Sequence, residues 1–230
     1  MEFYIPKHID LKYDELVVAC YTFGKGLPLD EMLVHTTEIT GHRKAFLSLC
    51  PGNVITDEVL TMVCSYLSHK QLLEDNAELS FLPPDFSASL LAGHLTPEKA
   101  LDKYQFSFLQ SSRKSKKVFI PLKDECDWYL LVVDMKSKET VILEPYFLED
   151  RIAIHEEAVT AVMKLLDNLA PLLCSVDGQI LKISYFDIIK PYGEPYADVP
   201  QDSGVWVCQW MLRVSCLTLM MFRTWMKDFE

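Results

Sequence analysis

The sequence predicts one α+β domain, residues 1–230, in which helices come first and strands then wrap around a buried helix. The composition is that of an ordinary globular protein, with 230 residues of which 50% are hydrophobic and 24% charged. The first hundred residues carry apolar side chains at helical spacing, whereas the middle of the chain changes to short, β-branched apolar runs. Helices followed by strands and a final apolar helix are typical of the α+β class.

Six segments are expected to be helical. Thr56 is placed to cap one of them, with Asp57 and Glu58 in the first turn, where the helix dipole favours acidic side chains. Pro97 takes the first position of another, where its missing N–H costs nothing. We expect helices over residues 11–23 and 28–36, from Thr56 through Leu67, from Thr96 onward, over 152–169 and over 205–222.

Four segments are expected to be strands. Residues 128–135 read WYLLVVDM, which is nearly all apolar and typical of a strand buried on both faces. The polar residues 136–139 separate this strand from residues 140–143, so the two predict a hairpin. Residues 118–122 and 181–188 complete the set, and the prolines between 191 and 200 indicate a loop.

The charge disfavours a nucleic-acid partner. Lys and Arg number 22 against 33 Asp and Glu, which gives a net charge of −11. An acidic surface repels phosphate backbones. The one basic cluster, residues 113–117, is short and typical of a solvated loop, so it is a weak nuclear signal.

The cysteines indicate a reducing compartment. There are 7, an odd number, with no CxxC spacing, and most sit inside apolar runs as small buried hydrophobes do. Residues 1–7 have no signal-peptide pattern. Gln209, Arg213 and Ser215 interrupt the apolar stretch 205–222, which favours a core helix over a membrane span. We therefore expect an intracellular protein, nuclear or cytoplasmic, with no membrane partner.

No metal or other cofactor is expected. Five of the histidines are scattered, and His155 with Glu156 and Glu157 lacks the HExxH spacing of a zinc helix.

Four places in the chain can converge on one site. Asp127-Trp128 opens the buried strand, Glu144 ends its partner strand, Ser203 precedes the last apolar helix, and residues 52–59 open an earlier helix. The N-terminus of a helix favours a thiolate or an oxyanion. Such an arrangement suits a nucleophile, a base and a group that orients the base.

These segments resemble the ubiquitin-like-protease family, the cysteine peptidases that process and remove SUMO and related modifiers. The corresponding segments read VITDEVL, VFIPL, DWYLLVVD, VILEPY and PQDSGVWVCQWM, in the family's order and spacing. The match covers about residues 45–211 and leaves residues 1–44 as a helical N-terminal extension. The resemblance implies a papain-like cysteine-peptidase fold of the SUMO-protease type. Such a fold has a central mixed sheet flanked by helices, with a buried helix that here would start near Ser203.

The chain departs from the family at each triad position. The resemblance places the family's nucleophilic Cys on Ser203, its His on Asp127 and its Asp on Glu144. A serine hydroxyl without a base is a poor nucleophile, and a carboxyl with a usual pKa of about 4 does not replace imidazole. Losing one member of a triad typically costs about 10⁴- to 10⁶-fold in rate.

Three further positions are carried over from the family. Gln201 corresponds to the oxyanion-hole donor, although it lies closer to residue 203 than the family spacing. Trp128 corresponds to a residue that roofs the channel for the modifier's Gly-Gly tail. Val54 stands where the family has a second roof residue, a Trp.

The sequence leaves three functions open. The first is a pseudo-protease that acts as a protein-interaction module, with SUMO or another ubiquitin-like modifier as a candidate partner. The second is an active isopeptidase, or one silenced by a Cys-to-Ser change at 203. The third is an unrelated α+β domain, in which Ser203 is only a helix cap and Asp127 a solvated loop residue. The oligomeric state is left open.

Asp127 and Glu144 form an expected pair if the ancestral geometry survives. Two carboxylates at that range repel, so one should have a raised pKa or the two should share a proton. Alternatively, the side chains turn apart or a cation lies between them.

Overall fold

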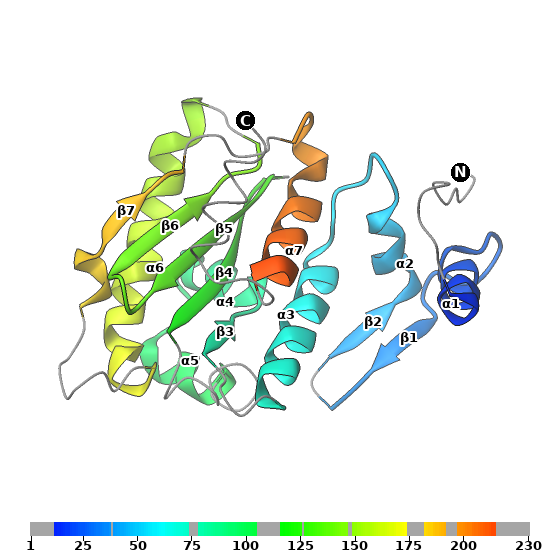
Figure 1. Ribbon diagram of the computed structural model, residues 1–230, viewed down its shortest axis with the longest axis horizontal. Helices are drawn as coiled ribbons and strands as arrows, with labels where there is room; N and C mark the ends of the chain where they lie inside the picture. Colours follow the sequence, from blue (N-terminus) through cyan, green and yellow to red (C-terminus); the bar gives the residue numbers. More distant parts are fainter. Residues whose placement is uncertain are drawn as a thin grey trace.

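A computed structural model describes residues 12–37, 39–73, 78–104, 116–125, 127–146, 149–173, 182–191 and 197–214 (Figure 1). Residues 113–115 of the basic cluster, Cys126 and the C-terminal part of the predicted helix 205–222 lie outside the described residues.

The centre of the molecule is a five-stranded mixed sheet in the order β3-β4-β5-β6-β7. Its strands are β3 (Leu79–Phe81), β4 (Lys117–Asp124), β5 (Asp127–Asp134), β6 (Glu139–Leu143) and β7 (Asp187–Ile189). The three middle strands are antiparallel to one another, and the two outer strands pair in parallel. The mixed sheet and the α+β class are confirmed.

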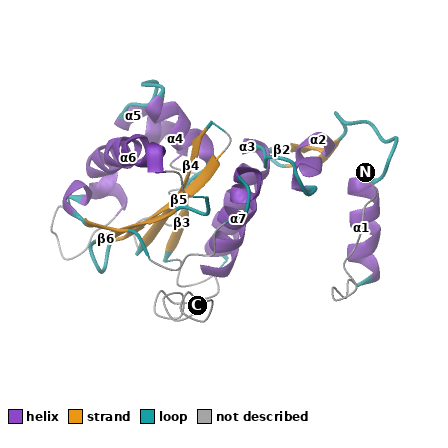
Figure 2. Cartoon of the chain, turned by 90° about the horizontal axis from the view of Figure 1, so that it is seen from above, coloured by secondary structure: helices purple, strands orange, loops and turns teal. Residues whose placement is uncertain are grey.

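Helices cover the sheet on both sides (Figures 1 and 2). One group consists of α4 (Pro84–Leu91), α5 (Pro97–Tyr104) and α6 (Ile152–Leu173). The other consists of α3 (Asp57–Leu72) and α7 (Ser203–Val214), of which α7 packs on β5. Short 3₁₀ turns, η2 (Glu149–Arg151), η3 (Ile183–Tyr185) and η4 (Pro200–Asp202), join these elements.

The first part of the chain forms a separate layer beside α3. It contains α1 (Tyr13–Phe23), the hairpin β1 (Met32–His35) and β2 (Thr40–His42), α2 (Arg43–Phe46) and η1 (Leu47–Leu49). The buried Arg43 side chain ties these pieces together: it bonds Glu31 at 2.5 Å and the carbonyls of Tyr21 and Thr22.

The core confirms the prediction for the central strand. Every residue of β5 from Trp128 to Asp134 is buried, as expected of a strand covered on both faces. The hairpin of β5 and β6, the start of α3 at Asp57 and the start of α5 at Pro97 also agree with the sequence.

Three predictions about elements were wrong. Residues 28–36 contain β1 rather than a helix, because Val34, Ile39 and neighbouring threonines are β-branched and pair across a short turn. The predicted strand 181–188 is a 3₁₀ turn followed by the short β7. Thr56 precedes α3 but its hydroxyl makes no capping bond.

Four cysteines lie in the part of the chain that the structure describes. Cys20, Cys50, Cys64 and Cys208 carry no disulfide. No helix in the described ranges is long and apolar enough to cross a bilayer.

Candidate functional site

The four predicted segments meet at one end of the sheet. The N-terminus of α7 packs against the start of β5, and β6 brings Glu144 beside the same end. Residues 54–56, which precede α3, lie against the same strand start, because the carbonyl of Ile55 accepts a hydrogen bond from Trp128 Nε1 at 3.0 Å.

Ser203 is fully buried at the first position of α7. Its Oγ donates to the carbonyl of Pro200 at 2.6 Å and accepts from the backbone N–H of Trp128 at 2.8 Å. The hydroxyl thus joins η4, α7 and β5. The proton of the hydroxyl and one of its lone pairs are both engaged in these two bonds.

Trp128 closes the space in front of Ser203. The indole is 1% exposed. A Cβ added to Gly204 would lie 2.8 Å from Ile55 Cβ and 2.9 Å from Trp128 Cδ1. Only glycine allows α7, β5 and the segment before α3 to approach so closely. Val54, the other roof position, is half-buried in that segment.

A cation lies over the indole of Trp128. Lys123 Nζ, at the end of β4, is 4.8 Å from the centroid of the Trp128 ring and 2.9 Å from Asp57 Oδ1. The ion pair and the cation–π contact therefore join the first turn of α3 to the start of β5.

Asp127 begins β5, opposite Asp124 at the end of β4. Burial raises the pKa of the Asp127 carboxyl above its ordinary 3.8, and the neighbouring Asp124 carboxylate adds to the rise. His155 and Arg151 act in the opposite direction. The pKa of Asp127 is therefore raised by burial and by Asp124. The sequence had predicted a rise caused by Glu144, which is not among these causes.

Glu144 bonds to a residue that the sequence did not single out. Its Oε1 lies 2.8 Å from Nδ1 of His155, on α6, and both side chains are buried. The imidazole also stacks on Tyr129, with ring centroids 4.2 Å apart at 21°. The acid that would orient a catalytic imidazole therefore holds a different imidazole, from the opposite helix layer.

Further charges surround this pair. Asp124 Oδ2 is 3.4 Å from His155 Nε2, an ion-pair distance without hydrogen-bond geometry. Arg151 bonds both oxygens of Asp124, at 3.0 and 3.2 Å, and reaches Glu125 at 3.0 Å. Burial, with the carboxylates of Asp124 and Glu144, raises the pKa of the Tyr129 hydroxyl. Arg151 and His155 thus both contact acidic side chains at this end of the sheet.

The predicted residues lie at the same end of the sheet, but they form two separate groups of contacts. Ser203 and Trp128 form one half with α7, and Glu144 forms the other with α6, while Asp127 lies between them at the strand start. Gln201 is half-buried in η4, two residues before Ser203.

His155 could have been found from the sequence. It occupies the same helical stripe as Ala158, Val159 and Val162, all of which are buried. A histidine on an apolar helix face needs a polar partner in the core. The lack of an HExxH spacing at His155 excludes a zinc helix, but it does not exclude a polar partner in the core. No group of metal-ligating side chains is present among the described residues.

A family comparison covers most of the chain, including the whole of this site. Residues 53–229 match the family model described as the Ulp1 protease family, C-terminal catalytic domain. The chain belongs to the Ulp1 protease family. The resemblance inferred from the segments is confirmed, and the match extends past Met211 to residue 229. No curated protein matches the sequence.

Solved Ulp1-type structures share the fold. The SUMO protease Ulp1 with its catalytic cysteine oxidised to a sulfinic acid aligns with a TM-score of 0.67 at 16% identity, over 90% of this chain and 85% of that chain. The Ulp1 protease domain in complex with Smt3, the yeast orthologue of SUMO, gives 0.68 at 14% identity, over 90% and 86%. The Ulp1-like SUMO protease domain of Chaetomium thermophilum gives 0.59 at 15%, over 89% and 79%.

Proposed function

We propose that this Ulp1-family domain is catalytically inactive and acts as a protein-interaction module. The state of Ser203 carries the proposal. A nucleophile must be accessible and must lose its proton to a base, whereas the Ser203 hydroxyl is buried and donates its proton to a backbone carbonyl. Residue 127, where the family resemblance places the base, is a carboxyl.

The closed roof supports the same proposal. In the family, a channel between two roof residues receives the modifier's tail. Here Ile55, Trp128 and Gly204 are in mutual contact and Lys123 covers the indole, so little space remains for a Gly-Gly tail. A ubiquitin-like modifier is the first candidate partner because a related Ulp1 domain binds Smt3. We propose that its folded body, rather than its tail, makes the contact.

One observation favours the alternative, an isopeptidase that is active or silenced at one position. The Glu144–His155 pair is an acid–imidazole pair of the kind that peptidases use. In this alternative His155 would be the base, and Ser203→Cys alone would give activity.

Turnover and binding together separate the two. Purified protein, Ser203→Ala, Ser203→Cys and the triple change Asp127→His, Glu144→Asp and Ser203→Cys are assayed on SUMO precursors and on fluorogenic SUMO conjugates. We expect no turnover from the native protein or from Ser203→Cys. Efficient cleavage that Ser203→Ala abolishes would refute the proposal, and cleavage by Ser203→Cys alone would establish the alternative.

Calorimetry with SUMO, and with SUMO lacking its Gly-Gly tail, tests the binding mode. Equal affinities for the two are expected if the folded body makes the contact. A loss of affinity on tail removal would show that the channel opens. Absence of binding to either form would exclude SUMO as the partner and leave the catalytic question to the turnover assay.

A further inference from the structure

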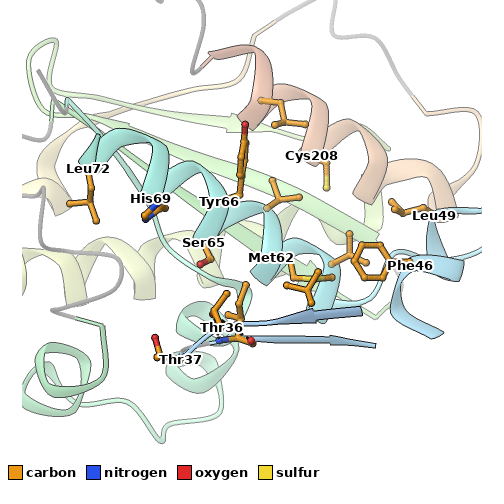
Figure 3. Close-up of a pocket in the computed structure, with 15 residues that line it drawn as sticks. Thr36, Thr37, Phe46, Leu49, Met62, Ser65, Tyr66, His69, Leu72 and Cys208 are labelled. Atoms are coloured by element: carbon orange, nitrogen blue, oxygen red, sulfur yellow. Dashed lines mark hydrogen bonds between the residues drawn. The ribbon is translucent and has the colours of Figure 1, made fainter. Parts of the chain in front are cut away.

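A second surface of the molecule has the form of a docking groove. It lies between the β1–β2 hairpin, α3 and α7, and has a volume of about 950 Å³ (Figure 3). No Asp, Glu, Lys or Arg among the described residues lines it. Its walls are largely apolar and include Val34, Phe46, Met62, Leu72, Cys208 and Leu212.

The groove has the length and periodicity of a helix site. The α3 residues that line it recur every three or four positions, from Val59 through Met62, Tyr66 and His69 to Leu72. At 1.5 Å per residue this stripe is about 20 Å long. An uncharged groove of that length accepts the apolar face of another helix.

Helix α1 presents the complementary surface. None of its residues is buried, and Tyr13, Val17 and Val18 are 78%, 49% and 64% exposed. A helix of 11 residues is marginal in water without packing. Its C-terminal end is fixed to the hairpin layer by Arg43, so its free apolar face is held out from the body.

The two surfaces do not meet within one chain. Figure 2 shows α1 beyond α2 and the hairpin, on the side away from α3. We propose that the groove of one copy binds α1 of a second copy. Asp14 and Glu15 at the start of α1 and Lys70 at the end of α3 favour an antiparallel arrangement, in which these opposite charges meet. At about 16 Å, α1 matches the stripe on α3.

This proposal does not rest on the proposed function, because Ser203, Trp128 and Gly204 do not line the groove. Sedimentation velocity and light scattering on the full chain, over a range of concentrations, measure self-association. We expect a concentration-dependent dimer or larger assembly. Val17→Asp on α1 and Tyr66→Glu on α3 each place a charge in the contact, and each should raise the dissociation constant by roughly tenfold or more.

Ile154→Asp is the matched control, because Ile154 on α6 is 49% exposed, as Val17 is. It should leave self-association unchanged. Since Val17 and Tyr66 are exposed, their variants should keep the native circular dichroism spectrum and unfolding midpoint. Combining Val17→Asp with Tyr66→Lys should recover association, because the two new charges attract across the contact.

Three results would overturn the proposal. The first is a chain that remains monomeric at every concentration. The second is association weakened by Tyr66→Glu but not by Val17→Asp, which would assign the groove to another occupant. The third is an equal effect from Ile154→Asp, which would indicate non-specific aggregation.

Discussion

Replacing Ser203 by alanine tests whether this residue is part of the framework. The hydroxyl is 0% exposed and makes two hydrogen bonds, to the carbonyl of Pro200 and from the N–H of Trp128. The substitution leaves the buried N–H of Trp128 without this acceptor, whereas the carbonyl of Pro200 still accepts the backbone N–H of residue 203. Leaving such a group unsatisfied costs about 1–3 kcal/mol. We therefore expect Ser203→Ala to lower the free energy of unfolding by about 2 kcal/mol.

For a domain of this size, that loss corresponds to a fall in Tm of about 4–8 °C. Urea unfolding monitored by tryptophan fluorescence suits the measurement, because Trp128 and Trp210 are buried and change environment on unfolding. Ser89→Ala is the control, because the Ser89 hydroxyl donates to the exposed carboxylate of Asp85 in α4. It should change the free energy of unfolding by less than about 0.5 kcal/mol.

An unchanged or raised stability of Ser203→Ala would refute the reasoning. Catalytic nucleophiles are commonly held at a cost to stability, so their removal is neutral or stabilising. A measurable loss in the free energy of unfolding would show that Ser203 has a structural role. No loss would leave Ser203 as a candidate nucleophile.

Three other outcomes are expected. Gly204→Ala should lower stability by about 1–3 kcal/mol in a thermal scan, because the new methyl overlaps Ile55 and Trp128; a stabilised variant would mean that the roof is looser than described. Glu144→Gln and His155→Gln, measured singly and together by urea unfolding, should show a coupling of about 0.5–3 kcal/mol, and additive effects would contradict the buried pair. Asp127→Asn should be more stable than the native protein at neutral pH. A raised pKa means that the folded state favours the protonated carboxyl, so ionisation penalises folding above the folded pKa. The advantage of the variant should shrink as pH falls through that pKa and vanish below 3.8, and an advantage that persists in acid would show another cause.

Much of the fold followed from local patterns. The apolar run at 128–135 and its polar connector specified the central hairpin, because a strand buried on both faces has no polar side to alternate. The helix start at Asp57 followed from acidic residues in a first turn. The segment 28–36 was misassigned because it is too short for its period to be read, and its β-branched residues were outweighed by the helical neighbours.

The candidate site was predicted less completely. Segment order located Asp127, Trp128, Glu144 and Ser203, because each stands at the boundary of an element that the sequence marks. It did not find His155, since an apolar helix face shows that a side chain is buried but not what it touches. The predicted repulsion between the carboxylates of Asp127 and Glu144 took no account of a partner for Glu144, whereas Glu144 is paired with His155.

The central hairpin, the serine at residue 203 and the carboxyl at residue 127 can be read directly from the chain. Three facts required the assembled molecule: the engaged hydroxyl of Ser203, the packing of Trp128 over the start of α7, and the Glu144–His155 pair. The first two join segments that are remote in the chain, since residues 128 and 203 are 75 positions apart, and the third joins the end of β6 to the next helix. Local propensity carries no information about such contacts, because packing alone brings those segments together.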